Sequence, residues 1–109
     1  MRVFRAVPAL PATVEDFRSY RELGKAPPRA PGVTRDKADG VSVFNTLERV
    51  RKVAAELELG EWIVELELPD DGSVEIGPVS PHGHVTLWAP KELLVKCVVA
   101  TFSLIEPGS

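Results

Sequence analysis

Hydrophobic residues between Gly40 and Pro69 recur first in a run, then at helical steps and then at alternate positions. Residues 41–44 are β-branched or aromatic apart from Ser42, which is typical of a short buried strand. Residues 47–57 place apolar side chains at steps of three and four, which predicts an amphipathic helix. Residues 62–68 follow a period of two, with Ile63 as an exception, so we predict a strand–helix–strand unit at the centre of the chain.

Polar residues mark the expected ends of this helix. Asn45 suits an N-cap, because its side-chain oxygen can accept one of the unpaired amides of the first turn. Glu48 follows three residues later and completes a pattern similar to a capping box. Gly60 is expected to close the helix at or near the C′ position.

The strand after Gly60 is expected to bury one face and leave the other solvated. Its expected core residues are Trp62, Val64, Leu66 and Leu68. Its expected solvated face carries Glu61, Glu65 and Glu67, with Ile63 among them. Pro69 ends this strand, and the Asp-Asp-Gly sequence that follows predicts a tight turn.

The rest of the chain supplies the remaining elements of an α+β domain. Before the central unit, we expect a first strand at Arg2–Val7, with Val3 and Arg5 on one face, and a helix capped by Thr13, with Asp16 at N3, that ends near Gly24. After it, we expect a short strand at Val74 and Ile76 and a strand at His84–Ala89. A helix at Lys91–Lys96 with Pro90 at N1 and a central strand at Cys97–Ile105 complete the series. The predicted fold is a single domain over residues 1–109, with a mixed, mainly antiparallel sheet of about five or six strands and about three flanking helices.

A proline-rich, locally basic stretch at residues 25–40 interrupts this series. Pro27, Pro28 and Pro31 exclude a regular helix. A connector without regular structure is the simpler interpretation, and a lid or a substrate-facing loop is the alternative.

Composition narrows the range of partners. The chain of 109 residues carries a formal net charge of -3, so nucleic acid is not expected as a partner. Cys97 is the single cysteine, which excludes an internal disulfide and fits a reducing, cytoplasmic compartment. No apolar run approaches the length of a signal peptide or a membrane span, so we expect the protein not to associate with a membrane. The initial methionine suggests a complete small protein.

His82 and His84 are the only two histidines, and in an extended segment they project to the same side. A metal site normally takes about three or four protein ligands, and no other motif with ligand spacing accompanies this pair. We therefore predict no metal site and expect hydrogen-bonded histidines in a turn. Cys97 or Glu75 would have to approach in space to complete such a site.

Ser42 and Arg5 are the other candidates. Ser42 stands in no Gly-x-Ser-x-Gly elbow, so no hydrolase triad is predicted. It is either a serine bonded to the backbone or a ligand-binding hydroxyl beside Asn45. Arg5, a charge on a strand near the core, requires an anionic partner. That partner is either a ligand or one of the carboxylates Glu65, Glu67 and Glu75.

Three motifs in this order resemble small ADP-ribosyltransferase-like domains, which are found among bacterial toxins and related proteins. They are an arginine in a first strand (VFRAV), a Gly-x-Ser-x-Phe strand leading into a helix (GVSVFNT), and an alternating strand (WIVELELP). The resemblance covers most of the chain in the order of its elements. It implies that Arg5 contacts the ribose or phosphate of NAD and that Ser42 shapes the nicotinamide pocket. The late glutamate or glutamine that directs transfer in that family is missing from PHGHVTLW, where His84 or Trp88 would take its region.

Two functions follow as expectations. The first is a small cytoplasmic bacterial module, toxin-related and non-catalytic, that binds a ligand or another protein. Its protein partner, or a second copy in a homodimer, would bind an exposed strand or an apolar patch around Trp88 and Phe102. The alternative is an NAD-utilising ADP-ribosyltransferase or NAD glycohydrolase with Arg5, Tyr20, Ser42 and His84 lining the cofactor pocket. No complete catalytic set decides between a binding module and an enzyme.

Overall fold

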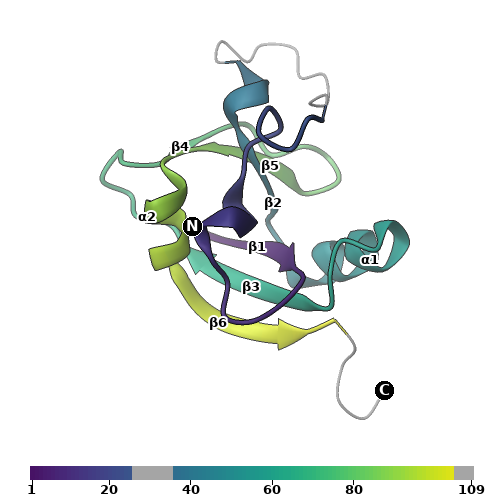
Figure 1. The fold of residues 1–109 in the computed structure, drawn as a ribbon. Helices are drawn as coiled ribbons and strands as arrows, with labels where there is room; N and C mark the ends of the chain where they lie inside the picture. The colour runs from purple at the N-terminus through teal and green to yellow at the C-terminus, as the bar shows by residue number, and fades with distance from the viewer. Residues whose placement is uncertain (26–35, 105–109) are drawn as a thin grey trace.

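Six strands form one antiparallel sheet in the computed structural model, which describes residues 1–25 and 36–104 (Figure 1). The strands are β1 Arg2–Val7, β2 Val41–Phe44, β3 Trp62–Glu67, β4 Glu75–Ile76, β5 His84–Trp88 and β6 Val98–Ser103. Their order across the sheet is β4-β5-β2-β1-β3-β6. The expected number of strands is confirmed, but the sheet is not mixed as predicted, because every strand pair is antiparallel.

The described chain contains two α-helices, α1 Leu47–Leu57 and α2 Lys91–Lys96, so the expected third helix is wrong. Two short 3₁₀ turns, η1 Val14–Phe17 and η2 Lys37–Asp39, complete the elements. The Asp16 carboxylate accepts from the Thr13 amide at 2.7 Å, as the sequence predicts. However, the backbone is extended at Arg18, and a new turn begins where Ser19 Oγ accepts from the Glu22 amide at 3.2 Å. This side-chain bond competes with continued helix, which limits the segment to one 3₁₀ turn.

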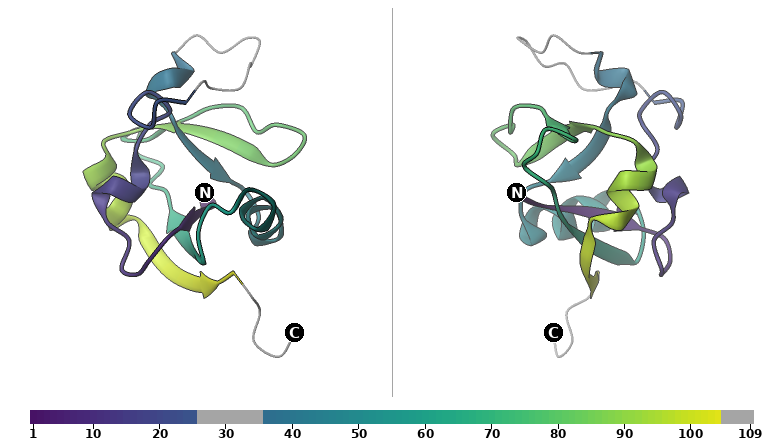
Figure 2. Two further views of the ribbon diagram at one scale, coloured as in Figure 1. Left: turned by 45° about the vertical axis from the view of Figure 1, so that its right-hand side comes forward. Right: turned by 90° about the vertical axis from the view of Figure 1, so that its left-hand side faces the viewer.

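Both faces of the sheet are covered, because α1 and α2 lie on opposite sides of it (Figure 2). On one side, α1 packs over β1 and β2 and buries Val50 and Ala54. On the other side, η1 contacts α2, and Phe17 and Leu94 from these elements join the main core. The other buried members of that core are Val3, Val7, Val41, Val43, Val64, Leu66, Leu68, Val74, Val85 and Leu87.

Coverage of both faces overturns the expected alternation of β3. Ile63 is fully buried although it stands among the glutamates, and Trp62 is 36% exposed. Glu65 is only 8% exposed, because β3 lies between β1 and β6 and the guanidinium of Arg2 pairs with its carboxylate. Glu65 is therefore a buried ion-pair partner and not a solvated residue.

The ends of α1 lie close to their expected positions but use different residues. Thr46, not Asn45, is the N-cap, and its side chain accepts from the Arg49 amide at 3.2 Å. Asn45 instead donates its backbone amide to the Gly83 carbonyl at 2.9 Å. The helix ends at Leu57, and Glu58 takes the left-handed conformation expected of a glycine C-cap, with φ 53°. Gly60, two residues later, begins the approach to β3.

The C-terminal strand is shorter than predicted and lies elsewhere in the sheet. It was expected at the centre because Cys97–Ile105 is apolar and β-branched, yet β6 forms an edge of the sheet. Its alternate residues are more exposed, as at Val99, which is 53% exposed. Pro90 is the N-cap of α2 and not N1. The strand predicted at Val74 and Ile76 is confirmed only over the two residues of β4.

Candidate functional site

The sheet has one weak junction, between β1 and β2. Along β1, every residue has a partner on β3, whereas β2 is aligned with β1 only at Phe4 and Phe44. Figure 1 shows β4, β5 and β2 in one group of strands and β1, β3 and β6 in the other. On the side of the Phe4–Phe44 pair that holds Arg5 and Ser42, no further residue of β1 is aligned with β2, and the candidate site lies in this separation.

Arg5 extends from β1 into this separation. Its NH1 donates to the Ser42 carbonyl on β2, and its Nε donates to the Asp16 carbonyl at the end of η1. Burial lowers the pKa of the Arg5 guanidinium, opposed by the nearby Tyr20 and Asp16. Arginine nevertheless remains a cation at neutral pH. Among the described residues, no carboxylate forms an ion pair with Arg5.

Two of the glutamates proposed as partners for Arg5, Glu65 and Glu67, pair with Arg2 instead. The Arg2 guanidinium pairs with Glu65 and lies 3.2 Å from Glu67. These two carboxylates raise the pKa of Arg2, with the Glu65 hydrogen bond as the main cause. Arg5 therefore retains a partly buried positive charge that is solvated by carbonyl dipoles.

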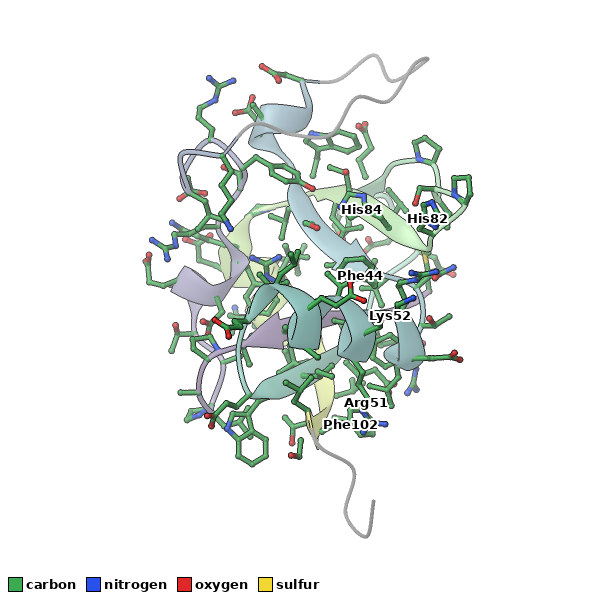
Figure 3. All side chains as sticks on the ribbon, turned by 90° about the vertical axis from the view of Figure 1, so that its right-hand side faces the viewer. Phe44, Arg51, Lys52, His82, His84 and Phe102 are labelled. Carbon is green, nitrogen blue, oxygen red and sulfur yellow. The ribbon has the colours of Figure 1, made fainter. Side chains whose placement is uncertain are left out.

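Tyr20, Ser42 and His84 form a hydrogen-bonded cluster beside Arg5. Ser42 Oγ lies 2.7 Å from His84 Nε2, and Tyr20 Oη lies 2.9 Å from the same nitrogen. Burial raises the pKa of Tyr20, while a hydrogen bond with Ser42 and the charge of Arg5 lower it. The His84 ring packs edge-on against Phe44, with ring centroids 5.6 Å apart (Figure 3).

All four predicted site residues line one pocket of about 490 Å³. The pocket draws on β1, β2, β5, α1 and the segment that follows β1. Its lining residues are Arg5, Ala6, Pro8, Glu15, Asp16, Arg18, Tyr20, Leu23, Lys25, Ser42, Phe44, Val53, Leu57, Leu59 and His84. The structure thus brings together side chains that lie far apart in the sequence.

One end of α1 gives this pocket an apolar wall. Val53, Leu57 and Leu59 line it opposite the polar cluster. Leu57 is 64% exposed and Leu59 is 37% exposed, so the apolar face predicted for the helix is only partly used for the core. The pocket therefore combines cationic groups, hydroxyl groups and an apolar surface.

Other predicted chemistry lies outside the pocket. His82 is exposed, in the loop beside β5 (Figure 3), and within residues 1–25 and 36–104 no cluster of possible ligands could hold a metal ion. Trp88 is 5% exposed and donates its indole N–H to the Asp36 carbonyl at 3.0 Å. Phe102 lies on β6, across the sheet from β5, and packs on Phe4. The predicted patch of Trp88 and Phe102 is therefore wrong.

Sequence reasoning missed several residues of the pocket. The segment after β1 contributes Glu15, Arg18 and Lys25 to the lining. The one sequence signal for these residues is that their segment follows the strand that carries Arg5, a predicted ligand-binding residue. Of the stretch 25–40, Lys25 lines the pocket, and Arg21 binds the Ala38 carbonyl through its amide at 2.7 Å. Residues 26–35, on which the lid or connector interpretation rests, lie outside the described residues.

In the described part of the chain, no helix is long and apolar enough to cross a bilayer. Comparison of the chain with family models, with curated proteins and with solved structures finds no match. The likeness to ADP-ribosyltransferase domains therefore stays a prediction from short motifs, and the pocket has to be interpreted from its own chemistry.

Proposed function

We propose that this protein is a binding module for a small anionic ligand, and that a nucleotide of the NAD type occupies the pocket. The observation that carries the proposal is the guanidinium of Arg5, which is partly buried at the pocket and forms no ion pair with a carboxylate of the described residues. A buried cation is stabilised most by an anion that accepts its remaining N–H groups. A phosphate oxygen has the charge and the geometry for that role.

The charges around the pocket favour the same class of ligand. Arg18 and Lys25 add two exposed cations, while Glu15 and Asp16 supply the acidic side chains of the lining. Glu15 already faces Arg18 at 3.9 Å. Within residues 1–25 and 36–104, Arg5 and Lys25 form no ion pair with a carboxylate, and they supply a net attraction for phosphate.

The apolar wall favours a ligand that also carries a flat ring. Phe44 and Leu57 offer surface on which an aromatic base can pack, and burial of such a ring is favourable in water. The hydroxyls of Tyr20 and Ser42 can bond to ribose or amide groups. A nucleotide combines all three kinds of group, whereas inorganic phosphate uses only the cations.

A thermal-shift titration with NAD, ADP-ribose and nicotinamide tests the proposal. A ligand that binds only the folded protein raises its Tm by mass action. We expect a saturable shift with NAD and ADP-ribose that Arg5→Ala abolishes. Because Arg5 also donates hydrogen bonds to the backbone carbonyls of Asp16 and Ser42, the Tm of this variant without ligand has to be measured as well.

Two exposed arginines give a matched test and control. Arg18→Ala removes a cation of the pocket and should weaken binding by up to about fivefold. Arg21→Ala removes an arginine that pairs with Asp36 and Asp39 away from this pocket, and it should leave binding unchanged. No shift at millimolar NAD or ADP-ribose, or an equal effect of both variants, would contradict the proposal.

An NAD-utilising enzyme is the second candidate, favoured by the cluster of hydroxyls around the His84 imidazole. In this interpretation the nicotinamide ring lies near Ser42, and the protein transfers or hydrolyses the ADP-ribosyl group. The carboxylates of the pocket come from η1 and not from a late strand. Release of nicotinamide from NAD, measured by chromatography, would establish turnover, and binding without release would leave a binding module.

A homodimer is the third candidate, because the outer edge of β6 has no neighbouring strand in the described chain. Val99 is exposed on this strand, and an antiparallel second copy would extend the sheet. Sedimentation at rising concentration should then show a dimer that Val99→Lys dissociates. A monomer at all concentrations would exclude this interaction.

A further inference from the structure

Ser42 and His84 meet at a distance that suits proton transfer. Ser42 Oγ is 2.7 Å from His84 Nε2, although 42 positions separate the two residues. Both line the open pocket, so a bound molecule can reach the hydroxyl. Nucleophilic serines are recognised by such a contact between the hydroxyl and a basic imidazole.

We propose that Ser42 is a nucleophile activated by His84, and that the pocket hydrolyses or transfers the acyl group of a small ester that carries a negative charge. This activity goes beyond nucleotide binding and does not depend on NAD as the ligand. The sequence offered no base for Ser42, because no elbow motif or triad is present. The fold supplies that base from β5.

Rigid elements hold both groups. Ser42 and His84 lie two positions apart across the ladder between β2 and β5, where Ser42 is aligned with Thr86 and Phe44 with His84. The His84 backbone amide donates to Ser80 Oγ at 3.0 Å, and its carbonyl accepts from the Ser80 amide at 2.9 Å. With the Phe44 ring against the imidazole, this arrangement fixes the position of Nε2.

The cations of the pocket suit the charge that develops in acyl transfer. Arg5 donates to the carbonyl of Ser42 itself, so its guanidinium lies next to the nucleophile. A positive group beside the reacting carbonyl stabilises the oxyanion of a tetrahedral intermediate. Arg18 and Lys25 attract the anionic substituent of the ester, which sets the expected substrate class.

The reaction proceeds in two balanced steps. Ser42 Oγ forms a bond to the acyl carbon while His84 Nε2 takes the hydroxyl proton, and the alcohol leaves with that proton as the ester bond breaks. Water then attacks the acyl-serine, with His84 again taking a proton, and Ser42 is released with its hydroxyl restored. The sum is ester plus water to acid plus alcohol, with no oxidant or reductant.

Tyr20 provides a test that is specific to this geometry. Its Oη lies 2.9 Å from the same nitrogen. In the tautomer whose Nε2 is the acceptor, which the proposed base requires, Tyr20 and Ser42 compete for one lone pair. Tyr20→Phe removes this competitor, so a nucleophilic Ser42 should react faster than it does in the wild-type protein.

Covalent labelling with a small fluorophosphonate measures this reactivity directly. The Oγ–P bond forms, the P–F bond breaks, fluoride leaves and His84 takes the proton. We expect a single adduct in the intact mass, mapped to Ser42 and absent from Ser42→Ala. His84→Gln, which keeps a polar partner for both hydroxyls, should lower the labelling rate by about tenfold or more while the protein stays folded.

Ser73→Ala is the matched control, because Ser73 Oγ contacts a carboxylate, Asp71, at 2.6 Å and no imidazole. This variant should label like the wild-type protein. Labelled wild-type protein should in turn lose its hydrolysis of a carboxylate-bearing p-nitrophenyl ester. The proposal is overturned by no adduct on folded protein, by an adduct at another residue, or by equal rates for wild type and His84→Gln. Because no nucleotide is added, these outcomes do not depend on the NAD titration.

Discussion

Tyr20 is the single tyrosine of the chain, so its titration can be followed alone. Burial disfavours the phenolate and raises the pKa of Tyr20 above its ordinary value of 10.0, although Ser42 and Arg5 oppose the shift. We predict that the phenolate absorbance of the folded protein appears at higher pH than that of the protein in denaturant. Coincident titrations would place the Tyr20 hydroxyl in open solvent and contradict the pocket geometry.

The same shift predicts a dependence of stability on pH. Because the folded state holds this proton more strongly, the contribution of Tyr20 to stability is complete below the unfolded pKa and is lost as the pH rises through the folded pKa. The free energy of unfolding should therefore fall with rising pH above about 10. Tyr20→Phe should remove this part of the decline, and an identical decline in the variant would show that other groups cause it.

Gly60 is expected to be sensitive to substitution for two separable reasons. Its φ is +145°, and a Cβ at this position would lie 2.4 Å from the Val7 carbonyl oxygen, a backbone atom that cannot move aside alone. Gly72 also has a positive φ, of +87°, but a Cβ there would meet nothing within 4 Å. Gly72→Ala should cost about 1 to 2 kcal/mol from φ alone, and Gly60→Ala more than about 3 kcal/mol because overpacking adds to it. Denaturant unfolding of both variants measures the difference, and equal losses would mean that the close approach to Val7 does not matter.

At the scale of elements, the N-cap of α1 is a different residue from the one that the sequence pattern predicts. Thr46 caps the helix through its side chain, whereas Asn45 was the better sequence candidate. Thr46→Ala should therefore destabilise the protein by about 1 kcal/mol, and Thr46→Ser should restore most of it because serine offers the same acceptor. A larger loss in Asn45→Ala than in Thr46→Ala, measured by denaturant unfolding, would return the cap to Asn45.

Periodicity predicted most elements because each one has a face that the core requires. The strands β1, β2, β3 and β5 and the helices α1 and α2 all appear close to their predicted residues. The pattern could not reveal that the second face of β3 is also covered, which buries Ile63 and Glu65. It also could not distinguish a central strand from an edge strand in the apolar run of β6, because that depends on partners distant in sequence.

The sequence predicted which residues line the candidate site but not how they contact one another. Short motifs indicate Arg5 and Ser42, whereas Tyr20 and His84 complete the predicted lining, and all four line one pocket in the structure. What no pattern could provide is the contact between them, because Tyr20 and His84 are 64 positions apart. The sequence also could not predict which backbone carbonyls accept from Arg5, or that Leu57 and Leu59 line the pocket, because both depend on how β1 and β2 separate in the fold.

At the scale of the whole molecule, the junction of β1 and β2 divides the sheet into two units of unequal strength. The unit β1-β3-β6 has a ladder on each side of β3: β1 and β3 are aligned over six residue pairs, and the ladder between β3 and β6 has one register shift, between Glu65 and Leu66. The unit β4-β5-β2 is joined to it in the sheet at Phe4 and Phe44, with Arg5 bonded across the gap. Units with few shared bonds open separately in the native state.

We therefore predict that the backbone amides of β2 and β5 exchange with deuterium faster than those of β3, by at least about tenfold, which corresponds to about 1.4 kcal/mol of opening free energy. A ligand that contacts Arg5 and Ser42 together would connect the two units, so NAD at saturation should slow exchange in β2 and β5 more than in β3. Hydrogen exchange followed by mass spectrometry measures both effects in one experiment. Equal protection of the two units without ligand would show that the single aligned pair and Arg5 are enough to make the sheet one cooperative unit. In that case the pocket would be a fixed cavity, and ligand would slow exchange evenly across the sheet.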